Sequence, residues 1–427
     1  MFSWVGDKES NFALKKAEDF SLENMKKALE ILGNPHEKLK NVIHIAGTNG
    51  KGSTTTFLWN ILRCAGYKVH KYTSPHILKF NERITIYDKD ISDLELENLS
   101  SYCREKIGHL GLTFFEVTTL IAFLAFEKNS ADFVVLETGL GGKFDSTNVF
   151  SEKLCAIITS ISLDHTQILG NNLEDIAQNK AGILPSAKYK ILSKSAADLI
   201  KNEDCYAYDR SFQTQGSFLD FSFKFPDCTS DFQNLTSGIQ GDHNLENASL
   251  AIAAALIISN SGYEISENSI RLGLKNAYIP YRIQKISGNL LNKFQAKGRG
   301  ADFYLDVSHN QDSIQKLCDF VQKYLKNVER IGIFSILKDK NSPDLYKILQ
   351  NIGFKKLYIA EIKGNIRAEL PENILENIAK YTNIDAEIVE DIPELLRNLC
   401  QNSSPEGKDV LIFGSIYFIS GVCEIFS

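Results

Sequence analysis

A short apolar segment followed by a glycine-rich turn and a lysine constrains the fold of this chain more than any other feature. Residues 42–46 read VIHIA, followed by Gly47-Thr48-Asn49-Gly50-Lys51-Gly52-Ser53 and a helix-like segment from Thr54 to Ala65. In this order of strand, loop and helix, backbone N–H groups and the positive end of a helix face a polyphosphate. Because glycines let the backbone approach the phosphates, we expect a nucleotide site in which Lys51 reaches the terminal phosphates.

The loop differs from the common phosphate-binding loop at two positions. Ile45 stands where the first glycine of G-x-x-x-x-G-K-[ST] would be, and Gly52 directly follows the lysine. The residue after the lysine is normally a hydroxyl that binds Mg²⁺. A metal ligand must therefore come from elsewhere in the chain, and a glycine turn without a ligand remains the alternative.

Composition limits the class of protein. A chain of 427 residues with 43% hydrophobic residues predicts two to three globular domains. There is no apolar run of membrane-spanning length, no basic leader region and no Cys-x-x-Cys pair among the eight cysteines, so we expect a cytoplasmic protein with reduced thiols and no zinc. The net charge of −6 and the lack of a basic run argue against nucleic acid. We further expect a monomer without a membrane partner.

The first part of the chain alternates between strand and helix patterns. A helix is predicted over residues 1 to about 40, where Leu22, Met25, Leu29 and Leu32 have helical spacing. Strands are predicted at 42–46, 68–73, 132–138 and 154–161, with helices at 54–65, 92–107 and 115–129. This alternation indicates an α/β domain with a mostly parallel sheet, in which ligands gather at the carboxyl ends of strands.

The pattern changes after residue 205 and again near 280. Phe221, Phe223 and Phe225 alternate with polar residues, which predicts antiparallel strands within 205–240. Helices are predicted at 243–260 and 265–277, then a linker near Ile279-Pro280-Tyr281. Further strands are predicted at 302–307, 330–335, 356–361, 384–389 and 409–413, and helices at 311–326, 343–351, 372–380 and 392–400. We therefore predict two α/β domains, 1–281 and 282–427, with ATP held in one wall of a cleft between them.

Several polar residues follow predicted strands. Glu137 precedes a glycine-rich segment, where a carboxylate near the phosphate loop suits Mg²⁺. His165 also ends a predicted strand, although such a histidine is more often a structural hydrogen-bonding group. Lys180 lies late in a helical segment, where a surface lysine is the usual expectation. Arg282 beside the linker has two readings, a phosphate contact or a partner for a surface acid.

Taken together, these segments resemble the folylpolyglutamate synthase/dihydrofolate synthase family, relatives of the Mur peptidoglycan ligases. The resemblance extends through nearly the whole chain. Its motifs are Gly47–Ser53, Ser74-Pro75-His76, Asn81-Glu82-Arg83-Ile84, Thr113-Phe114-Phe115-Glu116, Glu137-Thr138-Gly139-Leu140-Gly141-Gly142, Leu163-Asp164-His165-Thr166, Lys180-Ala181-Gly182-Ile183 and Phe413-Gly414-Ser415. The resemblance implies a P-loop-containing Mur-ligase-like central domain with a parallel sheet and a smaller Rossmann-like C-terminal domain.

The resemblance also implies roles for individual residues. The implied Mg²⁺ ligands are Ser74, Glu137, His165 and a carbamylated (N6-carboxylated) Lys180, which binds a second Mg²⁺. The implied nucleotide contacts are Gly50, Lys51, Gly52, Ser53, Asn247, Arg282 and Asp306. The implied pteroate contacts are Ser21, Leu22, Glu23, Asn24, Thr113, Phe114, Phe115, Glu116, Phe144, Asp145 and Ser146. Arg83, His309 and Ser415 resemble the glutamate-handling residues, and with Lys51 and Lys180 they form the expected catalytic set.

The implied reaction joins L-glutamate to dihydropteroate and to the glutamate tail of reduced folates, using ATP and two Mg²⁺ ions, through an acyl phosphate. One alternative is a folylpolyglutamate synthase with a single activity. A Mur-type peptide ligase would need a nucleotide-sugar domain before the phosphate loop. Only 46 residues precede Gly47, which is too few for such a domain. A GTPase-like switch would need Asn-Lys-x-Asp, and Asn179-Lys180-Ala181-Gly182 lacks the aspartate.

Overall fold

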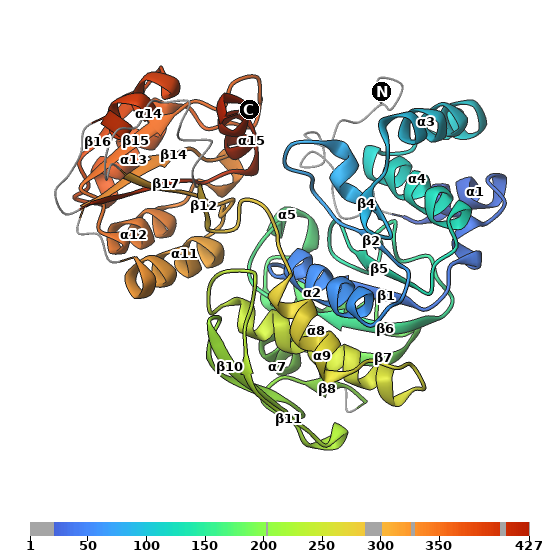
Figure 1. Cartoon of the computed structure of the whole chain (residues 1–427). Helices are drawn as coiled ribbons and strands as arrows, with labels where there is room; N and C mark the ends of the chain where they lie inside the picture. Colours follow the sequence, from blue (N-terminus) through green and yellow to red (C-terminus); the bar gives the residue numbers. More distant parts are fainter. Residues whose placement is uncertain (1–20, 202–203, 287–300, 326–328, 402–406, 427) are drawn as a thin grey trace. The chain divides into compact units, whose positions relative to one another are not determined.

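The computed structural model describes residues 21–201, 204–286, 301–325, 329–401 and 407–426. The chain divides into two compact units (Figure 1). The first comprises Met1–Ile239 and His243–Tyr278, and the second comprises Gln240–Asp242 and Ile279–Ser427. Within the described ranges, no helix has the length and apolar character needed to cross a bilayer.

The first unit is built on an eight-stranded sheet with the order β4-β3-β2-β5-β1-β6-β7-β8. Its strands are β1 (Val42–Ala46), β2 (Val69–Tyr72), β3 (Ile84–Ile86), β4 (Lys89–Asp90), β5 (Phe133–Glu137), β6 (Lys153–Ile158), β7 (Ala187–Leu192) and β8 (Tyr206–Ala207). The neighbours along β2-β5-β1-β6-β7-β8 pair in parallel, whereas β3 pairs antiparallel with both β2 and β4. Every residue of β1 and β5 is buried, as expected for strands covered on both faces. The predicted α/β class is confirmed.

Helices cover both faces of this sheet (Figure 1). On one face lie α2 (Lys51–Cys64), α8 (Asn244–Asn260) and α9 (Glu267–Lys275). The backbone of α9 packs so closely that a Cβ at Gly273 would lie 2.5 Å from Ile61 Cα in α2. On the other face, α3 (Asp93–Ile107) and α4 (Phe114–Lys128) form one apolar core with β2 and β5, and α6 (Leu173–Ala181) and α7 (Lys194–Leu199) form another with β6 and β7.

The N-terminal helix is shorter than predicted. Of the predicted helix over residues 1–40, the first twenty residues lie outside the described part of the chain. In the described part, α1 spans Glu23–Ile31, and a short 3₁₀ helix follows at Pro35–Lys38. Gly33 and Asn34 have φ angles of 79° and 52°. This left-handed pair, followed by a proline, ends the helix before residue 40.

The antiparallel segment predicted after residue 205 is confirmed. β9 (Gln213–Ser217), β10 (Asp220–Phe225) and β11 (Ser230–Leu235) form a separate antiparallel sheet with the order β11-β10-β9. Phe221, Phe223 and Phe225 are all buried on one face of β10. The alternation of apolar and polar residues therefore predicted the buried face of this strand correctly.

The second unit contains a six-stranded sheet with the order β12-β13-β17-β14-β15-β16. Its strands are β12 (Gln284–Ile286), β13 (Ala301–Leu305), β14 (Glu329–Phe334), β15 (Lys356–Ala360), β16 (Ala386–Val389) and β17 (Lys408–Phe413), and its helices are α11 (Gln311–Tyr324), α12 (Pro343–Ile352), α13 (Pro371–Tyr381), α14 (Ile392–Gln401) and α15 (Ile416–Phe426). Except for β12, all pairs are parallel. The predicted Rossmann-like alternation is confirmed, although α15 was not predicted.

Candidate active site

The glycine-rich loop connects β1 to α2 and leaves the start of α2 open. Gly50 is the N-cap of α2 with φ 89°, and the helix begins at Lys51, not at Thr54 as the sequence predicted. The glycine conformation brings Lys51 and Gly52 into the first turn. The first N–H groups of a helix have no partner within the helix, so this turn forms an anion-binding end.

Two glycines of the loop have no room for a side chain. A Cβ at Gly47 would lie 1.8 Å from Thr159 Oγ1, and a Cβ at Gly50 would lie 2.2 Å from Asn247 Oδ1. Gly50 and Asn247 were both predicted nucleotide residues, and the structure brings them into contact from α2 and α8. Glycine is thus required at both positions for the loop to pack against its neighbours.

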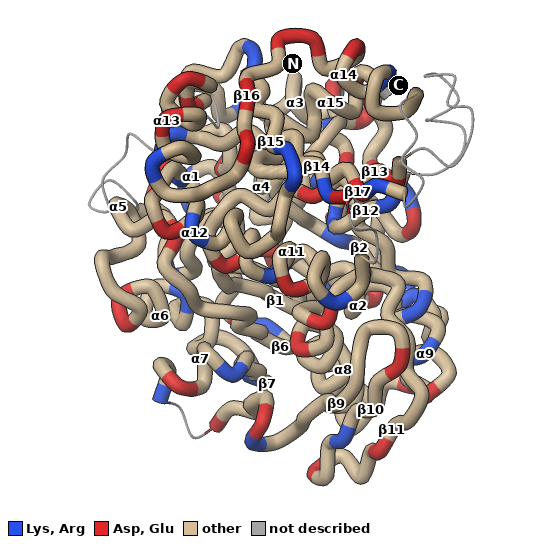
Figure 2. The backbone as a smooth tube through the Cα atoms, turned by 90° about the vertical axis from the view of Figure 1, so that its left-hand side faces the viewer, with Lys and Arg blue, Asp and Glu red and all other residues tan. Residues whose placement is uncertain are grey.

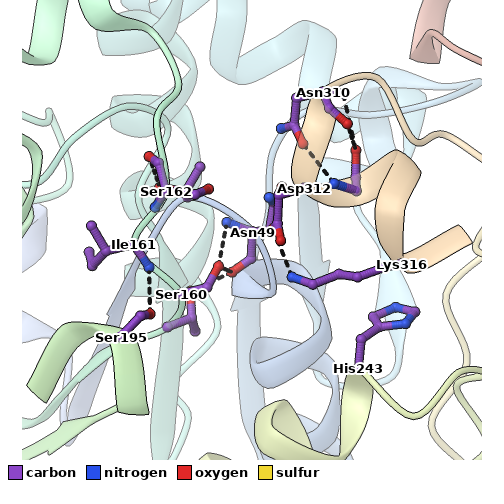
Figure 3. Close-up of polar contacts among 12 residues, drawn as sticks. Asn49, Ser160, Ile161, Ser162, Ser195, His243, Asn310, Asp312 and Lys316 are labelled. Carbon is purple, nitrogen blue, oxygen red and sulfur yellow. Dashed lines mark hydrogen bonds and ion pairs between the residues drawn. The ribbon is translucent and has the colours of Figure 1, made fainter. Parts of the chain in front are cut away.

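The loop is also braced by the segment that follows β6. Asn49 N–H donates to Ser160 Oγ at 3.1 Å, and the hydroxyls of Ser160 and Thr159 donate back to the carbonyl oxygen of Asn49 at 3.0 and 2.8 Å. Ile161 N–H donates to Ser195 Oγ at 2.9 Å (Figure 3). These contacts fix the loop conformation before any ligand is bound.

Two lysines meet at the carbonyl oxygen of Gly47. Lys51 Nζ donates to it at 3.1 Å and Lys180 Nζ at 2.8 Å. Lys180 is 3% exposed, so the expectation of a surface lysine is wrong. Burial and the nearby charge of Lys51 lower the pKa of Lys180 to about 7. A large fraction of this amine is therefore neutral near neutral pH.

Glu137, one of the predicted metal ligands, is a buried carboxylate beside the phosphate loop. Glu137 is buried at the end of β5, where its Oε2 accepts from Ser74 N–H at 3.4 Å and lies 3.5 Å from a Cβ built at Gly52. This carboxylate therefore lies at the start of α2. Among the described residues, no group of three or more His, Cys, Asp and Glu side chains is arranged as a metal site.

His165 does not end a strand, contrary to the sequence prediction. β6 ends at Ile158, and His165 is the N-cap of the one-turn helix α5 (Thr166–Leu169) with φ 49°. Its ring is 40% exposed, with Nε2 at 3.8 Å from Asp164 Oδ1. After β6 the chain turns to contact the phosphate loop, with Thr48 N–H donating to Ser160 O at 2.7 Å.

The predicted pteroate segment Thr113–Glu116 begins α4. Thr113 is the N-cap, with its hydroxyl accepting from Glu116 N–H, while Glu116 Oε2 accepts from Thr113 N–H at 2.8 Å. This reciprocal capping box accounts for both polar residues as helix-starting groups. Phe115 is buried against Gly139, where a Cβ would lie 2.4 Å from its ring.

Asp145 and Ser146 are buried, whereas Phe144 is 41% exposed. Asp145 Oδ2 accepts from Gly139 N–H and Leu140 N–H at 2.9 Å each. Burial raises the pKa of Asp145, and its hydrogen bonds oppose that effect. Asp145 therefore holds the backbone of the glycine-rich segment that follows Glu137 through two hydrogen bonds.

The earliest predicted substrate residues lie at the start of α1. Leu22 is its N-cap and packs against the apolar core, and Ser21, Glu23 and Asn24 are exposed. Arg83, in contrast, has no exposed surface. Its Nε donates to His76 Nδ1 at 2.8 Å, and its guanidinium carbon lies 5.6 Å from the ring of Phe114. Arg83 thus lies against the predicted pteroate segment in the first unit.

In the second unit, the predicted residues follow two adjacent parallel strands, β13 and β17. Asp306 is buried and accepts from Ile283 N–H and Ser308 N–H at 2.8 Å each. Burial raises its pKa, and the charge of Arg282 acts in the opposite direction. His309 Nδ1 lies 2.9 Å from Val307 O, and Ser415 is buried between β17 and α15.

Figure 2 shows basic and acidic residues interspersed along the elements of both units. In α11, for example, Lys316 Nζ pairs with Asp312 Oδ2 at 2.8 Å (Figure 3). Opposite charges on neighbouring turns can pair in this way along a helix.

Comparison with known proteins agrees with this architecture. The Mur ligase middle domain matches residues 45–255, and the glutamate ligase domain of Mur ligases matches residues 292–416. The dihydrofolate synthase/folylpolyglutamate synthase of Bacillus subtilis is 32% identical over 425 residues, covering 94% of each chain. The chain belongs to the dihydrofolate synthase/folylpolyglutamate synthase family.

Solved structures of this family have the same fold. Escherichia coli FolC in complex with DHPP and ADP superposes with a TM-score of 0.84 at 28% identity, covering 99% of this chain and 97% of that one. The bifunctional enzyme of Yersinia pestis, complexed with AMPPNP and an Mn ion, gives a TM-score of 0.80 at 27% identity, with 95% and 93% coverage.

In this member of the dihydrofolate synthase/folylpolyglutamate synthase family, sequence reasoning missed the groups that brace the site. Thr159 and Ser160 hold the loop, and Ser195 holds the segment that follows β6. Thr147 holds Asp145 and is itself bound by His44. Hydroxyls after a strand and a histidine within an apolar strand were visible signals. Which loop or carboxylate they would meet depends on sheet order, which no local pattern contains.

Proposed function

We propose that this protein is an ATP-dependent ligase that joins L-glutamate to dihydropteroate and to the glutamate tail of reduced folates. The observation that carries this proposal is the convergence of Lys51 and Lys180 on the Gly47 carbonyl, beside the open start of α2 and the buried carboxylate of Glu137. A phosphoryl-transfer site needs such local positive charge and a hard oxygen ligand. The ADP and AMPPNP complexes of family members support ATP as the nucleotide.

The chemistry follows from the need to activate a carboxylate. A carboxylate oxygen attacks the γ-phosphorus of ATP, so that an acyl phosphate forms and ADP leaves. The amino group of glutamate then attacks the acyl carbon and phosphate leaves, with loss of a proton from nitrogen. Lys51 stabilises charge on the transferring phosphoryl group, and His309 and Ser415 are proposed to stabilise the tetrahedral intermediate.

The proposed metal site consists of Ser74, Glu137 and His165 for one Mg²⁺, with carbamylated Lys180 for a second. The chain fits such a group because Glu137 is a buried carboxylate at the start of α2 and Lys180 is a buried amine with a pKa of about 7. A carbamate forms only on a neutral amine and presents oxygen atoms, which Mg²⁺ prefers. Bound Mg²⁺ would spread the phosphate charge during transfer.

The proposed substrate residues divide between the two units. The pteroate contacts are assigned to the starts of α1 and α4 and to Phe144–Ser146 of the first unit, whereas His309 and Ser415 for glutamate belong to the second. We therefore propose 1–281 as the ATP- and pteroate-binding domain and 282–427 as the glutamate-ligase domain, acting within a monomer in the cytoplasm.

The test is a direct assay of the purified protein with ATP, Mg²⁺ and L-glutamate. Dihydropteroate and a reduced folate are offered separately, and products are identified by mass. One glutamate added to each substrate is the expected result. Product from the folate alone would identify a folylpolyglutamate synthase with a single activity, and no product from either would overturn the proposal.

A further inference from the structure

Lys153, the first residue of β6, is a buried lysine outside the site described above. It is 3% exposed, and no carboxylate among the described residues lies within ion-pair distance of its amine. Its Nζ instead donates to Asn148 Oδ1 at 2.8 Å and lies 3.3 Å from His44 Nδ1. Burial lowers its pKa to about 7. Burying an amine costs desolvation free energy that an apolar side chain would not cost. We therefore expect the amine of Lys153 to have specific hydrogen-bond partners.

Besides Asn148, Lys153 contacts His44, in the middle of β1. The ring is fully buried, with Nε2 at 2.7 Å from Thr147 Oγ1. Burial first, and then the charge of Lys153, hold the pKa of His44 well below its usual value, so the ring is neutral and carries one proton. Thr147 uses its one hydroxyl proton for Asp145 Oδ1, so it can only accept from His44. The ring proton therefore lies on Nε2, and Nδ1 accepts from Lys153.

The remaining hydrogen bonds then have a single direction. His44 Nε2–H donates to Thr147 Oγ1, and the one hydroxyl proton of Thr147 donates to Asp145 Oδ1. Asp145 Oδ1 also accepts from Thr147 N–H at 3.0 Å. Its other oxygen remains available for the two N–H groups of Gly139 and Leu140. Each hydrogen bond along the path Lys153–His44–Thr147–Asp145 therefore has its donor on the side nearer Lys153 and its acceptor on the side nearer the carboxylate.

We propose that Lys153 and His44 are positioning residues, which act through Thr147 and Asp145 to hold the Gly139–Leu140 segment in the conformation that receives the pteroate substrate. This relay runs from the start of β6 through the middle of β1 to the segment after β5. It connects an amine to a carboxylate through two neutral groups, which transmit orientation without a direct ion pair. The link to substrate rests on the proposed function, whereas the relay itself is a property of the folded chain.

Two pairs of variants test the relay. Lys153→Met keeps the length of the side chain and removes its donors, and Lys188→Met removes an exposed lysine of the neighbouring β7 as its matched control. Thr147→Val keeps the shape and removes the hydroxyl, whereas Thr147→Ser keeps the hydroxyl. Hydrogen exchange at the Gly139 and Leu140 amides and ¹⁵N NMR of the His44 ring are measured without substrate.

We expect Lys153→Met and Thr147→Val to speed exchange at Gly139 and Leu140 by about three- to tenfold, the range that one lost hydrogen bond produces. Lys188→Met and Thr147→Ser should leave it near the parent value. The His44 ring of the parent should carry its proton on Nε2. In the assay, the KM for dihydropteroate should rise by a similar factor while the KM for ATP stays within about twofold.

Two results would overturn the relay. One is a parent His44 ring protonated on Nδ1, and the other is unchanged exchange at Gly139 and Leu140 in both Lys153→Met and Thr147→Val. An equal rise in the KM for ATP and for dihydropteroate would reduce Lys153 to a general structural role and would also overturn the proposal. Absence of ligase activity in the parent would contradict the proposed function alone, because the exchange and NMR measurements need no turnover.

Discussion

The Nζ atom of Lys180 donates a 2.8 Å hydrogen bond to the carbonyl oxygen of Gly47, across 133 residues of sequence. This contact brings the end of α6 against the start of the phosphate loop. It also places two lysine amines on one carbonyl, because Lys51 donates to the same oxygen. The mutual repulsion contributes to the low pKa of Lys180.

Lys180→Ala should abolish ligase turnover while leaving the fold intact, because the proposed carbamate ligand is lost. Short carboxylic acids added to the buffer should restore part of the activity by supplying carboxylate oxygens in the vacated space. Lys188→Ala, which removes an exposed lysine, is the control. Full activity of Lys180→Ala without any added acid would exclude the carbamate.

Activity should depend on pH and on dissolved carbon dioxide through the same lysine. With a pKa of about 7, Lys180 is mostly protonated below that pH and mostly neutral above it. Only the neutral amine forms a carbamate, so the carbamate is less favoured at pH 6 than at pH 8. Removal of carbon dioxide and bicarbonate should therefore reduce the initial rate by a larger factor at pH 6 than at pH 8. Initial rates that do not change on removal of carbon dioxide, at either pH, would contradict this expectation.

Lys51→Ala should reduce turnover by roughly 10²–10³ while ATP still binds. The N–H groups of the first turn of α2 remain to hold phosphate, but charge compensation at the transferring phosphoryl group is lost. Turnover and nucleotide affinity are measured together, with Lys89→Ala on the exposed β4 edge as the control. Turnover within about threefold of the parent would remove Lys51 from the mechanism.

Gly50→Ala should weaken ATP binding strongly, because its Cβ would lie 2.2 Å from Asn247 Oδ1. Gly66→Ala provides a matched control at the other end of α2. Gly66 has a similar φ of 92°, but a Cβ there meets no atom within 4 Å. Both variants carry the strain of a left-handed alanine, so a difference in nucleotide affinity by calorimetry isolates the clash at the loop. Equal affinities in the two variants would refute it.

Glu137→Gln should raise the Mg²⁺ concentration needed for half-maximal activity by about tenfold or more. The amide keeps the size of the side chain but loses the charge that a divalent ion prefers. A Mg²⁺ titration of the initial rate measures the effect, with the exposed Glu97→Gln on α3 for comparison. An unchanged Mg²⁺ requirement would show that Glu137 is a structural acceptor for Ser74.

Much of the fold follows from local patterns in the sequence. Apolar runs such as Val42–Ala46 and Phe133–Glu137 predicted buried parallel strands, and the alternating phenylalanines of β10 predicted an antiparallel sheet. Burial on two faces or one leaves a distinct spacing of apolar residues, so these features can be read without tertiary information. Errors occurred at the ends of elements, as at α1, α2 and β6, where single residues such as Asn34 and Gly50 adopt left-handed conformations.

The sequence by itself determined the class of fold, the phosphate loop and the family that its motifs resemble. The tertiary structure decided what each residue touches. Sheet order places β6 beside β1, so Ser160 meets the loop at Asn49 and Lys153 meets His44. The packing of α6 against the phosphate loop buries Lys180, whose sequence context suggested a surface position. Burial, pKa and hydrogen-bond direction depend on neighbours that are distant in sequence, and the order of strands and the packing of helices on the sheet bring those neighbours together.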